Sequence, residues 1–285
     1  MGKSERDELS ASVFDALIAA LGPGSIPKQR RAVMTLFRRF VARELGRRLL
    51  AEWGLGPPAG AGLFRLDPLE LRLDEWREQN QELGAAFERW WSLDAPPAPR
   101  PPELLGMRFE ALLGYELVRT GGTLALLPAR NRKRTGSFYT PSALSRAVVS
   151  EALDRVLALG RLDAQDLSVC DPACGAGAFL VEVAQQLLQR RLEQARLSGV
   201  PLDESAERRR IFGTAVCGVD VDPVALDVAR IVLYAAAREP SFDAITRPRL
   251  YLGDALGGRG FFDERGEQGA AWAPGAASRP DPARC

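Results

Sequence analysis

The 285-residue sequence contains no histidine, which removes several kinds of active site at once. Ser-His-Asp and Cys-His nucleophile systems, His-ligated metals and an imidazole base that works near neutral pH are all excluded. We therefore expect any chemistry to use other groups, and we predict no metal site. The balance of 38 Lys plus Arg against 37 Asp plus Glu, a net charge of +1, argues against a uniformly basic nucleic-acid binder but leaves room for a local patch.

Long apolar runs are also missing. No stretch of about 18 uncharged apolar residues occurs, and the first ten residues, MGKSERDELS, are polar where a signal peptide would be apolar. The four cysteines, at positions 170, 174, 217 and 285, have no CxxC spacing. We interpret them as buried small side chains in a reducing compartment, rather than as zinc ligands or disulfide partners. These features predict a cytoplasmic protein with no membrane partner.

The residues that are present divide the sequence into two regions. From residue 9 to 119 the apolar periodicity is helical, with Pro- and Gly-rich breaks at Gly54–Gly62 and Ala95–Pro102. We expect a mainly α-helical N-terminal domain over residues 1–120. Two apolar stripes mark its long helical segments: Val33, Phe37, Phe40, Val41 and Leu45 in the first, and Leu71, Trp76, Leu83, Phe87 and Trp90 in the second.

From residue 121 short apolar runs alternate with helical patterns. This alternation is typical of βαβ units with a parallel sheet, so we expect an α/β domain over residues 121–265. A tail rich in Gly, Ala, Pro and Arg, residues 266–285, is predicted to be irregular or disordered. The predicted strands are Leu167–Asp171, Val216–Asp220 and Arg249–Asp254, and the predicted helices between them are Ala178–Leu197 and Val224–Ala237.

A Gly-rich segment joins the first predicted strand to the next helix. In Asp171–Phe179, DPACGAGAF, Gly175 and Gly177 permit a tight turn and let a ligand approach the backbone beside a helix N-terminus. Such a loop suits a nucleotide-like cofactor. A plain strand-to-helix turn and a dinucleotide dehydrogenase stay open as alternatives, although Leu180 stands where the third glycine of the dinucleotide fingerprint should be.

The next two predicted strands also end in carboxylates, at the edge of the sheet where ligands bind in open α/β folds. Asp220, at the end of the second strand, could bind both hydroxyls of a ribose. Asp254 follows Gly253 at the end of the third strand; because Gly-Asp is common in turns, a turn role and a ligand contact stay open for it equally. Asp222, which precedes Pro223, is better explained as a helix N-cap than as a ligand contact.

With these features, residues 130–256 resemble the S-adenosylmethionine-dependent N6-adenine DNA methyltransferases of restriction-modification systems. Four segments carry the resemblance in the family's order: Arg134–Pro141 (RTGSFYTP), Asp171–Phe179, Gly218–Pro223 and Tyr251–Leu256. They are similar, in turn, to the family's N-terminal cofactor motif, Gly-rich loop, ribose-binding acidic motif and third motif. The resemblance implies S-adenosyl-L-methionine as cofactor and a Rossmann-like methyltransferase sheet, of which this sequence supplies the first three strands.

The resemblance also implies which residues bind the cofactor. Tyr139 and Thr140 would contact its methionine end, Asp220 would hold the ribose hydroxyls, and Asp254 would accept a hydrogen bond from the adenine amino group. Apart from the neighbouring motifs, Tyr139 could be a packed aromatic residue, Thr140 with Pro141 a helix start, and Asp171 an acceptor that stabilises the loop. The full implied set is Tyr139, Thr140, Pro141, Asp171, Ala173, Gly175, Gly177, Asp220 and Asp254.

One part of the family's pattern is missing. Enzymes that work on a base extrude it from the duplex, and in this family an Asn or Asp followed by Pro-Pro and an aromatic residue holds the adenine. Here neither Asn80 nor Asn131 precedes a proline, and Asp281-Pro282-Ala283-Arg284 lacks the second proline and the aromatic residue. We therefore predict no catalytic residue in this chain. We hypothesise that it is the N-terminal part of a longer methyltransferase, cut short near residue 266 by a frameshift or gene break.

Contact with nucleic acid could come from either of two basic clusters. In the Arg-rich helix near the N-terminus, a solvated face is favoured over phosphate contact; in the later cluster, a solvated loop and contact with the DNA backbone are equally supported. No lysine has Asp or Glu two residues before it, so we expect no nuclease of the D/E-x-K type. The clusters are Arg30, Arg31, Arg38, Arg39, Arg43, Arg47 and Arg48, and then Arg130, Arg132, Lys133 and Arg134.

Two functions of different class follow. The first is an adenine-specific DNA methyltransferase that transfers a methyl group to adenine N6 in duplex DNA and is inactive as this chain alone. The second is a non-catalytic protein that binds the cofactor or a partner, with a second chain supplying the catalytic and target-recognition parts. RNA and protein glutamine stay open as substrates, because related proteins share the cofactor loop.

Overall fold

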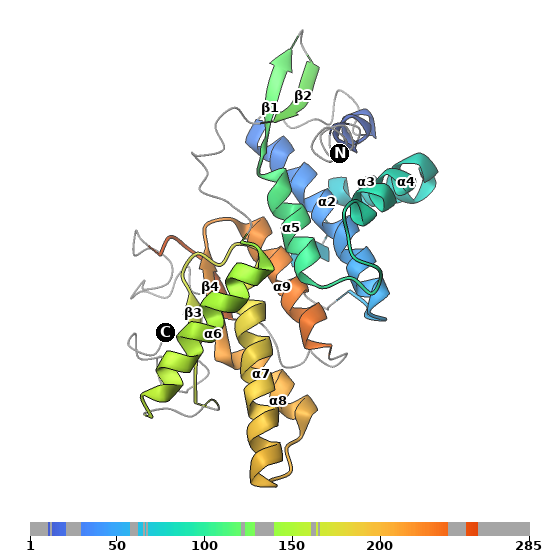
Figure 1. Cartoon of the computed structure of the whole chain (residues 1–285). Coiled ribbons are helices and arrows are strands. Elements are labelled where there is room, and N and C mark those ends of the chain that lie inside the picture. Colours follow the sequence, from blue (N-terminus) through green and yellow to red (C-terminus); the bar gives the residue numbers. More distant parts are fainter. Residues whose placement is uncertain are drawn as a thin grey trace. The chain divides into compact units, whose positions relative to one another are not determined.

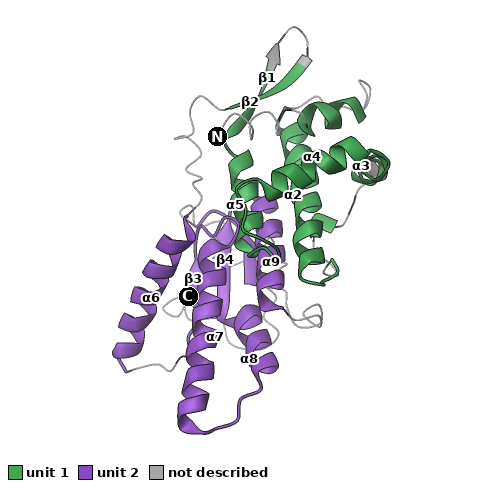
Figure 2. Cartoon of the chain, turned by 45° about the vertical axis from the view of Figure 1, so that its right-hand side comes forward, with its two compact units in different colours: residues 1–139 green, residues 140–285 purple. Residues whose placement is uncertain are grey.

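The computed structural model describes residues 11, 13–20, 30–57, 62–64, 66, 68–120, 123–128, 140–160, 164, 166–238 and 249–255. The chain divides into two compact units, residues 1–139 and residues 140–285 (Figure 2). The domain boundary expected at residue 120 stays a prediction, as does the irregular tail 266–285, which lies outside the described residues.

The first unit is mainly helical, as the apolar periodicity predicted. Its predicted first stripe is buried on one face of the long helix α2, and aromatic rings on α4 extend the same core. Phe40 and Phe87 meet edge to face with their ring centroids 5.8 Å apart. The elements are α2 (Arg30–Glu52), the 3₁₀ turn η1 (Gly62–Phe64), α3 (Pro68–Gln79), α4 (Gln81–Ser92), α5 (Glu103–Leu112), β1 (Tyr115–Thr120) and β2 (Thr123–Pro128) (Figure 1).

The second predicted stripe differs from the structure in two ways. The segment is broken at Asn80, whose side chain accepts a hydrogen bond from Leu83 N at 3.0 Å and begins α4 as a separate helix. Leu71 on α3 is 49% exposed, whereas Leu73 is buried. The leucine that α3 buries is therefore Leu73, two residues after the predicted Leu71.

A β-hairpin follows α5, in a region where the apolar periodicity predicts helix up to residue 119. Strands β1 and β2 pair antiparallel from Tyr115 with Pro128 to Thr120 with Thr123. Only Gly121 and Gly122 separate the strands in the sequence. A two-residue Gly-Gly connection between runs rich in Leu, Val and Thr is a hairpin signal that the helical interpretation overlooked.

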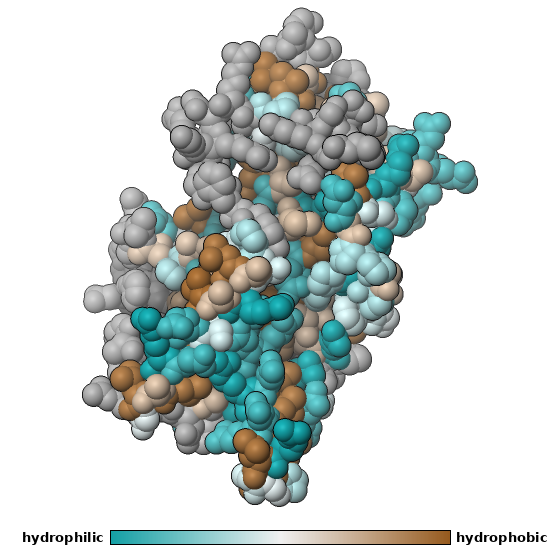
Figure 3. All heavy atoms as spheres, in the orientation of Figure 1, coloured by the Kyte–Doolittle hydropathy of each residue, from teal (hydrophilic) through white to brown (hydrophobic). Residues whose placement is uncertain are grey.

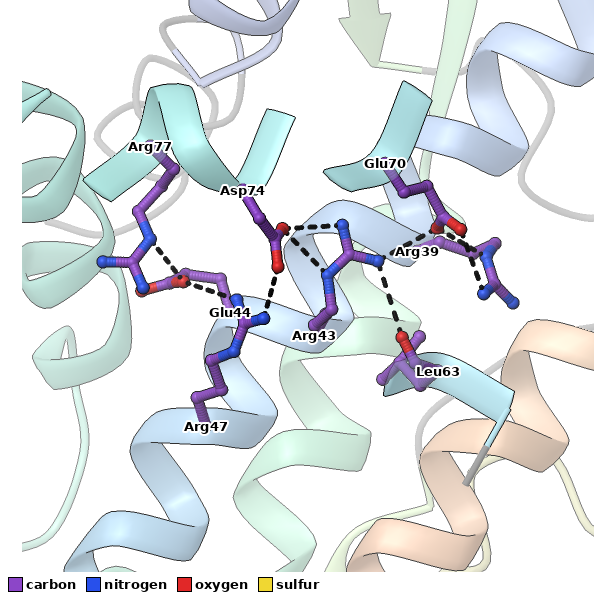
Figure 4. A network of polar contacts seen from close by, with 8 residues as sticks. All are labelled: Arg39, Arg43, Glu44, Arg47, Leu63, Glu70, Asp74 and Arg77. Atoms are coloured by element: carbon purple, nitrogen blue, oxygen red, sulfur yellow. Dashed lines mark hydrogen bonds and ion pairs between the residues drawn. The ribbon is translucent and has the colours of Figure 1, made fainter. Parts of the chain in front are cut away.

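The arginines of α2 form a buried ionic network with the acidic residues of α3 (Figure 4). Arg43 is fully buried, and it donates to Asp74 Oδ1 from Nε at 3.0 Å and to Glu70 Oε1 from Nη1 at 2.9 Å. Glu44 is also buried, and Arg77 Nε lies 2.9 Å from its Oε2. Buried charges are costly without partners, and this network supplies partners for the buried charges of both α2 and α3.

The second unit has a three-stranded parallel sheet in the order β3-β4-β5, with helices between the strands (Figure 1). Each predicted strand and helix of this region is present, within a few residues of its predicted ends. The α/β interpretation is therefore confirmed at this level. The elements are α6 (Ser142–Ala158), β3 (Val169–Asp171), α7 (Ala178–Ser198), α8 (Glu204–Arg210), the π-helical turn η3 (Ile211–Ala215), β4 (Val216–Asp220), α9 (Pro223–Ala237) and β5 (Arg249–Leu252).

Helix α6 packs on α7 through a mixed apolar and polar face (Figure 1). Val149 and Leu153 are buried, and Gln186 of α7 donates from Nε2 to the backbone oxygen of Arg146 at 3.1 Å. Helix α6 and its C-cap also carry exposed apolar residues, and apolar surface is visible over α6 in Figure 3. These residues are Leu144, Val148, Val156 and Leu159, which are 53%, 48%, 38% and 67% exposed.

Candidate functional site

The candidate site lies at the carboxyl edge of the parallel sheet. Asp171 is the last residue of β3 and Asp220 is the last residue of β4. Gly253, just after β5, donates from its backbone N to Asp220 O at 3.0 Å. Because all three strands run parallel, the carboxylates that the sequence placed at strand ends reach one edge, and Asp254 follows at the end of β5.

The Gly-rich loop turns directly from β3 into α7. Gly175 and Gly177 have positive φ values of +52° and +86°, in the left-handed region that favours glycine. Gly177 is the N-cap residue of α7, and its backbone N donates to Cys174 O at 2.8 Å. Both glycines singled out from the sequence thus occupy backbone conformations that other residues rarely adopt.

The loop is fixed to the neighbouring strand β4. Cys174 donates from its backbone N to Val219 O at 2.9 Å, and its side chain packs over Gly218. A Cβ placed on Gly218 would lie 2.7 Å from Cys174 Sγ and 2.8 Å from Leu180 Cδ1. Position 218 therefore has to be glycine for the loop to approach the strand this closely.

Asp220 is engaged on both of its carboxylate oxygens. Oδ2 accepts a hydrogen bond from Gly175 N at 2.9 Å, and Oδ1 accepts one from Asp222 N at 2.9 Å. The next carboxylate, Asp222, accepts from Val224 N at 2.9 Å and caps α9. The N-cap interpretation of Asp222 is confirmed, while the ribose-binding role of Asp220 stays a prediction.

Asp171 lies next to this carboxylate and is partly buried. Its Oδ1 accepts a hydrogen bond from Ala173 N at 3.0 Å, so it is an acceptor that stabilises the loop, as one interpretation of the sequence held. Burial raises the pKa of Asp171, and the negative charge of Asp220 raises it further, although the hydrogen bond from Ala173 acts in the opposite direction. Two carboxylates that repel each other would gain from a cationic group bound between them.

The residues of the first predicted motif lie on another element. Thr140 is half-buried and Pro141 is the N-cap residue of α6, whose backbone oxygen accepts from Leu144 N at 2.9 Å. The helix-start interpretation of these two residues is therefore confirmed, and their cofactor role stays a prediction. Tyr139 and the basic cluster from Arg130 to Arg134 lie outside the described residues.

Three cysteines lie at or beside the loop, and all three are free thiols. Cys174 and Cys217 are buried, as expected, whereas Cys170 is half-buried. Burial raises the pKa of the Cys174 thiol well above its usual value, and the charges of Asp171 and Asp220 add to the rise. Cys170 and Cys217 are register partners on β3 and β4, and a hydrogen bond with Cys217 lowers the pKa of Cys170. Their pairing could not be read from the sequence, because it depends on strand register.

The Arg-rich helix α2 gives a different result from either interpretation of its sequence. Arg43 is neither solvated nor available to phosphates, because Glu70 and Asp74 enclose it. Arg39 donates from Nε to Glu70 Oε1 at 2.8 Å. Arg30 and Arg31 at the start of the helix are exposed, so only this N-terminal end of the cluster fits the interpretation as a solvated face.

Among the described residues, no helix has both the length and the apolar character needed to cross a membrane. Within the same residues, no group of three or more His, Cys, Asp or Glu side chains is arranged to hold a metal ion.

Comparison with known proteins bears on the same region. Residues 122–239 match the family model described as N-6 DNA Methylase. Over 245 residues the chain is 21% identical to a Methanocaldococcus jannaschii protein named "Putative type II restriction enzyme and methyltransferase", a match that covers 69% of this chain and 20% of that protein. The resemblance to DNA methyltransferases of restriction-modification systems is thereby confirmed.

Two solved structures that resemble this chain in part are complexes with DNA. One is the DrdV–DNA complex, with 17% identity and a TM-score of 0.44 over 89% of this chain and 23% of that one. Another is the ATP-dependent Type ISP restriction-modification enzyme LlaBIII bound to DNA, with 12% identity and a TM-score of 0.46 over 84% of this chain and 16% of that one. The chain spans about a fifth of the length of the relatives it matches.

Proposed function

We propose that residues 139–255 bind S-adenosyl-L-methionine at the carboxyl edge of a Rossmann-like sheet. We further propose that the chain supplies the cofactor-binding half, within residues 121–265, of a DNA adenine methyltransferase. The observation that carries the proposal is the contact between Gly175 N and Asp220 Oδ2, with Asp171 next to Asp220. It joins the Gly-rich loop and the acidic residue of β4, which are two of the four motifs, in one site.

The charge of this site favours S-adenosyl-L-methionine over a dinucleotide. The loop sequence DPACGAGA contains no Lys or Arg; it begins with Asp171, and its Gly175 contacts Asp220. A pyrophosphate at the loop would meet these two negative charges with no cationic side chain of the loop to offset them. Burial raises the pKa of Asp171, and the charge of Asp220 adds to the rise. The ammonium and sulfonium groups of S-adenosyl-L-methionine are both positive and would offset that charge.

The residues of the chain would hold the cofactor along the strand ends. Asp220 would accept hydrogen bonds from the ribose hydroxyls, and Asp254 one from the adenine amino group. The loop backbone at Gly175 and Gly177 would lie beside the methionine end, together with Asp171. Tyr139, Thr140, Pro141 and Ala173 complete the proposed set by their place in the motifs.

The bound cofactor would supply a methyl group on a positively charged sulfur, and the proposed acceptor is adenine N6 in duplex DNA. None of the 285 residues forms the Asn-Pro-Pro-aromatic motif expected to hold that base. Transfer would therefore need a segment outside this sequence, on the same polypeptide or on a second chain. Adenine specificity and inactivity of this chain alone are both parts of the proposal.

Two measurements on the purified chain test it. In the first, calorimetric titration with S-adenosyl-L-methionine should give one site per chain. In the second, the chain is incubated with methyl-labelled cofactor and unmethylated duplex DNA, with RNA and with protein, and we expect no transfer to any of them. Binding failure in a folded sample would contradict the cofactor proposal, and transfer by this chain alone would contradict its proposed inactivity.

A non-catalytic function is the second candidate, and the missing motif is the observation that favours it. In that case the chain would bind the cofactor or a partner protein, a second chain would supply the catalytic and target-recognition parts, and the cofactor bound here would not be the methyl donor. Supplying a second chain that carries the Asn-Pro-Pro-aromatic segment separates the two candidates. Restored methylation of adenine supports the methyltransferase, and cofactor binding that never leads to transfer supports the non-catalytic protein.

A further inference from the structure

The Asp220 side chain is in direct contact with the Gly-rich loop. Asp220 Oδ2 accepts from Gly175 N at 2.9 Å, although the two residues are 45 positions apart in the sequence. The other oxygen, Oδ1, accepts from Asp222 N at 2.9 Å, two residues further along the chain. One carboxylate thus joins the end of β4, the start of α9 and the middle of the loop.

Gly175 is the point of the loop where such a bond matters most. Its φ of +52° lies in the left-handed region, outside the backbone conformations of regular helices and strands. On either side the loop is fixed by backbone bonds, from Cys174 N to Val219 O at 2.9 Å and from Gly177 N to Cys174 O at 2.8 Å. The bond to Asp220 is the side-chain contact that fixes the Gly175 amide between them.

We propose that Asp220 is a positioning residue for the Gly-rich loop as well as a ligand of the ribose, and that it sets the loop before cofactor binds. The proposal deepens the function given above and rests on it for the identity of the ligand. A carboxylate offers about four lone-pair positions, and the two amides occupy two of them. The ribose hydroxyls can use the others, so the contact with the loop persists in the complex.

A ligand without ribose hydroxyls can distinguish the two roles of Asp220, ribose binding and loop positioning. If Asp220 only bound the ribose, replacing it would not affect a ligand that has no ribose hydroxyls. If it also positions the loop, such a ligand would still bind more weakly to the variant, because the loop must then be ordered on binding. The suitable probes are S-adenosyl-L-homocysteine and its 2′,3′-dideoxy analogue.

The binding test uses the full chain and its Asp220→Ala variant. We expect Asp220→Ala to weaken the dideoxy analogue about tenfold or more, the range for a hydrogen bond to a charged group, and to weaken S-adenosyl-L-homocysteine further. Asp203→Ala is the matched control, because Asp203 also accepts from a backbone amide, Ala206 N at 3.0 Å, at the exposed start of α8. Equal affinity of wild type and Asp220→Ala for the dideoxy analogue would overturn the proposal.

A second readout needs no cofactor, so its failure is distinct from failure of the proposed function. Hydrogen exchange of the Gly175 amide, followed by nuclear magnetic resonance of the cofactor-free chain, should be slowed in wild type. It should become at least tenfold faster in Asp220→Ala and change little in Asp203→Ala. Asp220→Asn keeps an acceptor oxygen without the charge, and we expect intermediate exchange; this variant also serves if Asp220→Ala does not fold. Gly175 exchange that is the same in wild type and in the folded Asp220 variants would overturn the positioning role.

Discussion

A Cβ on Gly218 would lie 2.7 Å from Sγ of Cys174, so strand β4 and the Gly-rich loop can meet only because residue 218 has no side chain. The same approach brings Cys174 N within 2.9 Å of Val219 O and Gly175 N within 2.9 Å of Asp220 Oδ2. The proposed cofactor site thus depends on a glycine that does not itself face the ligand in the proposed arrangement.

Gly218→Ala should disrupt this approach. The new methyl group would contact Cys174 and Leu180 at less than van der Waals distance, and overpacking of this kind costs about 1–3 kcal/mol of folding free energy. We expect a lower unfolding midpoint and at least a tenfold loss of S-adenosyl-L-methionine affinity, measured by chemical denaturation and by calorimetry.

Gly84→Ala is the control for that substitution. Gly84 lies within α4, and a Cβ there has nothing within 4 Å. Because alanine restricts the unfolded chain and suits a helix, we expect a gain of about 0.4–1 kcal/mol in stability and unchanged cofactor binding. Equal effects of Gly218→Ala and Gly84→Ala on stability and cofactor binding would show that contact with Cys174 does not prevent a side chain at position 218.

Asp171→Asn should stabilise the protein while it weakens cofactor binding. Burial and the charge of Asp220 raise the pKa of Asp171 above its usual 3.8, so the folded state favours the protonated form. The ionised carboxylate therefore costs stability as pH rises from 3.8 through the raised pKa, and asparagine removes that cost.

Thermal unfolding between pH 3 and pH 8 measures this difference. The midpoint of Asp171→Asn should exceed that of wild type near neutral pH, and the two should converge below about pH 3.8, the usual pKa of the wild-type carboxyl. Asp166→Asn, at an exposed position before β3, is the control and should match wild type. A lower midpoint for Asp171→Asn near neutral pH would contradict the electrostatic description of the site.

Arg43→Ala should strongly destabilise the first unit. The substitution leaves Asp74 and Glu70, both buried, with fewer partners, and breaking a buried ion pair costs about 3–5 kcal/mol. Arg31→Ala, on the same helix but exposed, should change stability by no more than about 0.5 kcal/mol. Urea denaturation of both variants checks the difference, and similar midpoints would argue against the network in Figure 4.

The thiols near the loop should differ in reactivity. A hydrogen bond with Cys217 lowers the pKa of the half-buried Cys170, whereas burial raises that of Cys174. Since the thiolate is the nucleophile, iodoacetamide at neutral pH should label Cys170 well before Cys174 in the folded protein. Peptide mass spectrometry after timed labelling reads this order, and preferential labelling of Cys174 would contradict it.

The local signals in the sequence predicted most of the second unit. The strands ending at Asp171 and Asp220 are short apolar runs bounded by turn residues, and Asp222 with Pro223 is a local helix-start signal. These features depend on neighbouring residues, so their positions could be predicted within a few residues. The hairpin after α5 had a local signal too, at Gly121-Gly122, which the helical interpretation of that region overrode.

Features that depend on distant residues could not be predicted in the same way. Arg43 meets Asp74, 31 positions later, and the sequence does not show that α2 and α3 place both charges in the interior. The bond from Gly175 to Asp220 depends likewise on a partner 45 positions away. The sequence predicted candidate residues for the site, and the structure adds contacts between some of them, such as the bond from Gly175 to Asp220.

Calorimetric titration of the full chain and its Asp220→Ala variant with S-adenosyl-L-methionine tests the central claim most directly. The account predicts one site per chain in wild type, at least tenfold weaker binding in Asp220→Ala, and wild-type affinity in Asp203→Ala. A folded wild-type chain that does not bind the cofactor, or an Asp220→Ala variant that binds it as tightly as wild type, would contradict the account.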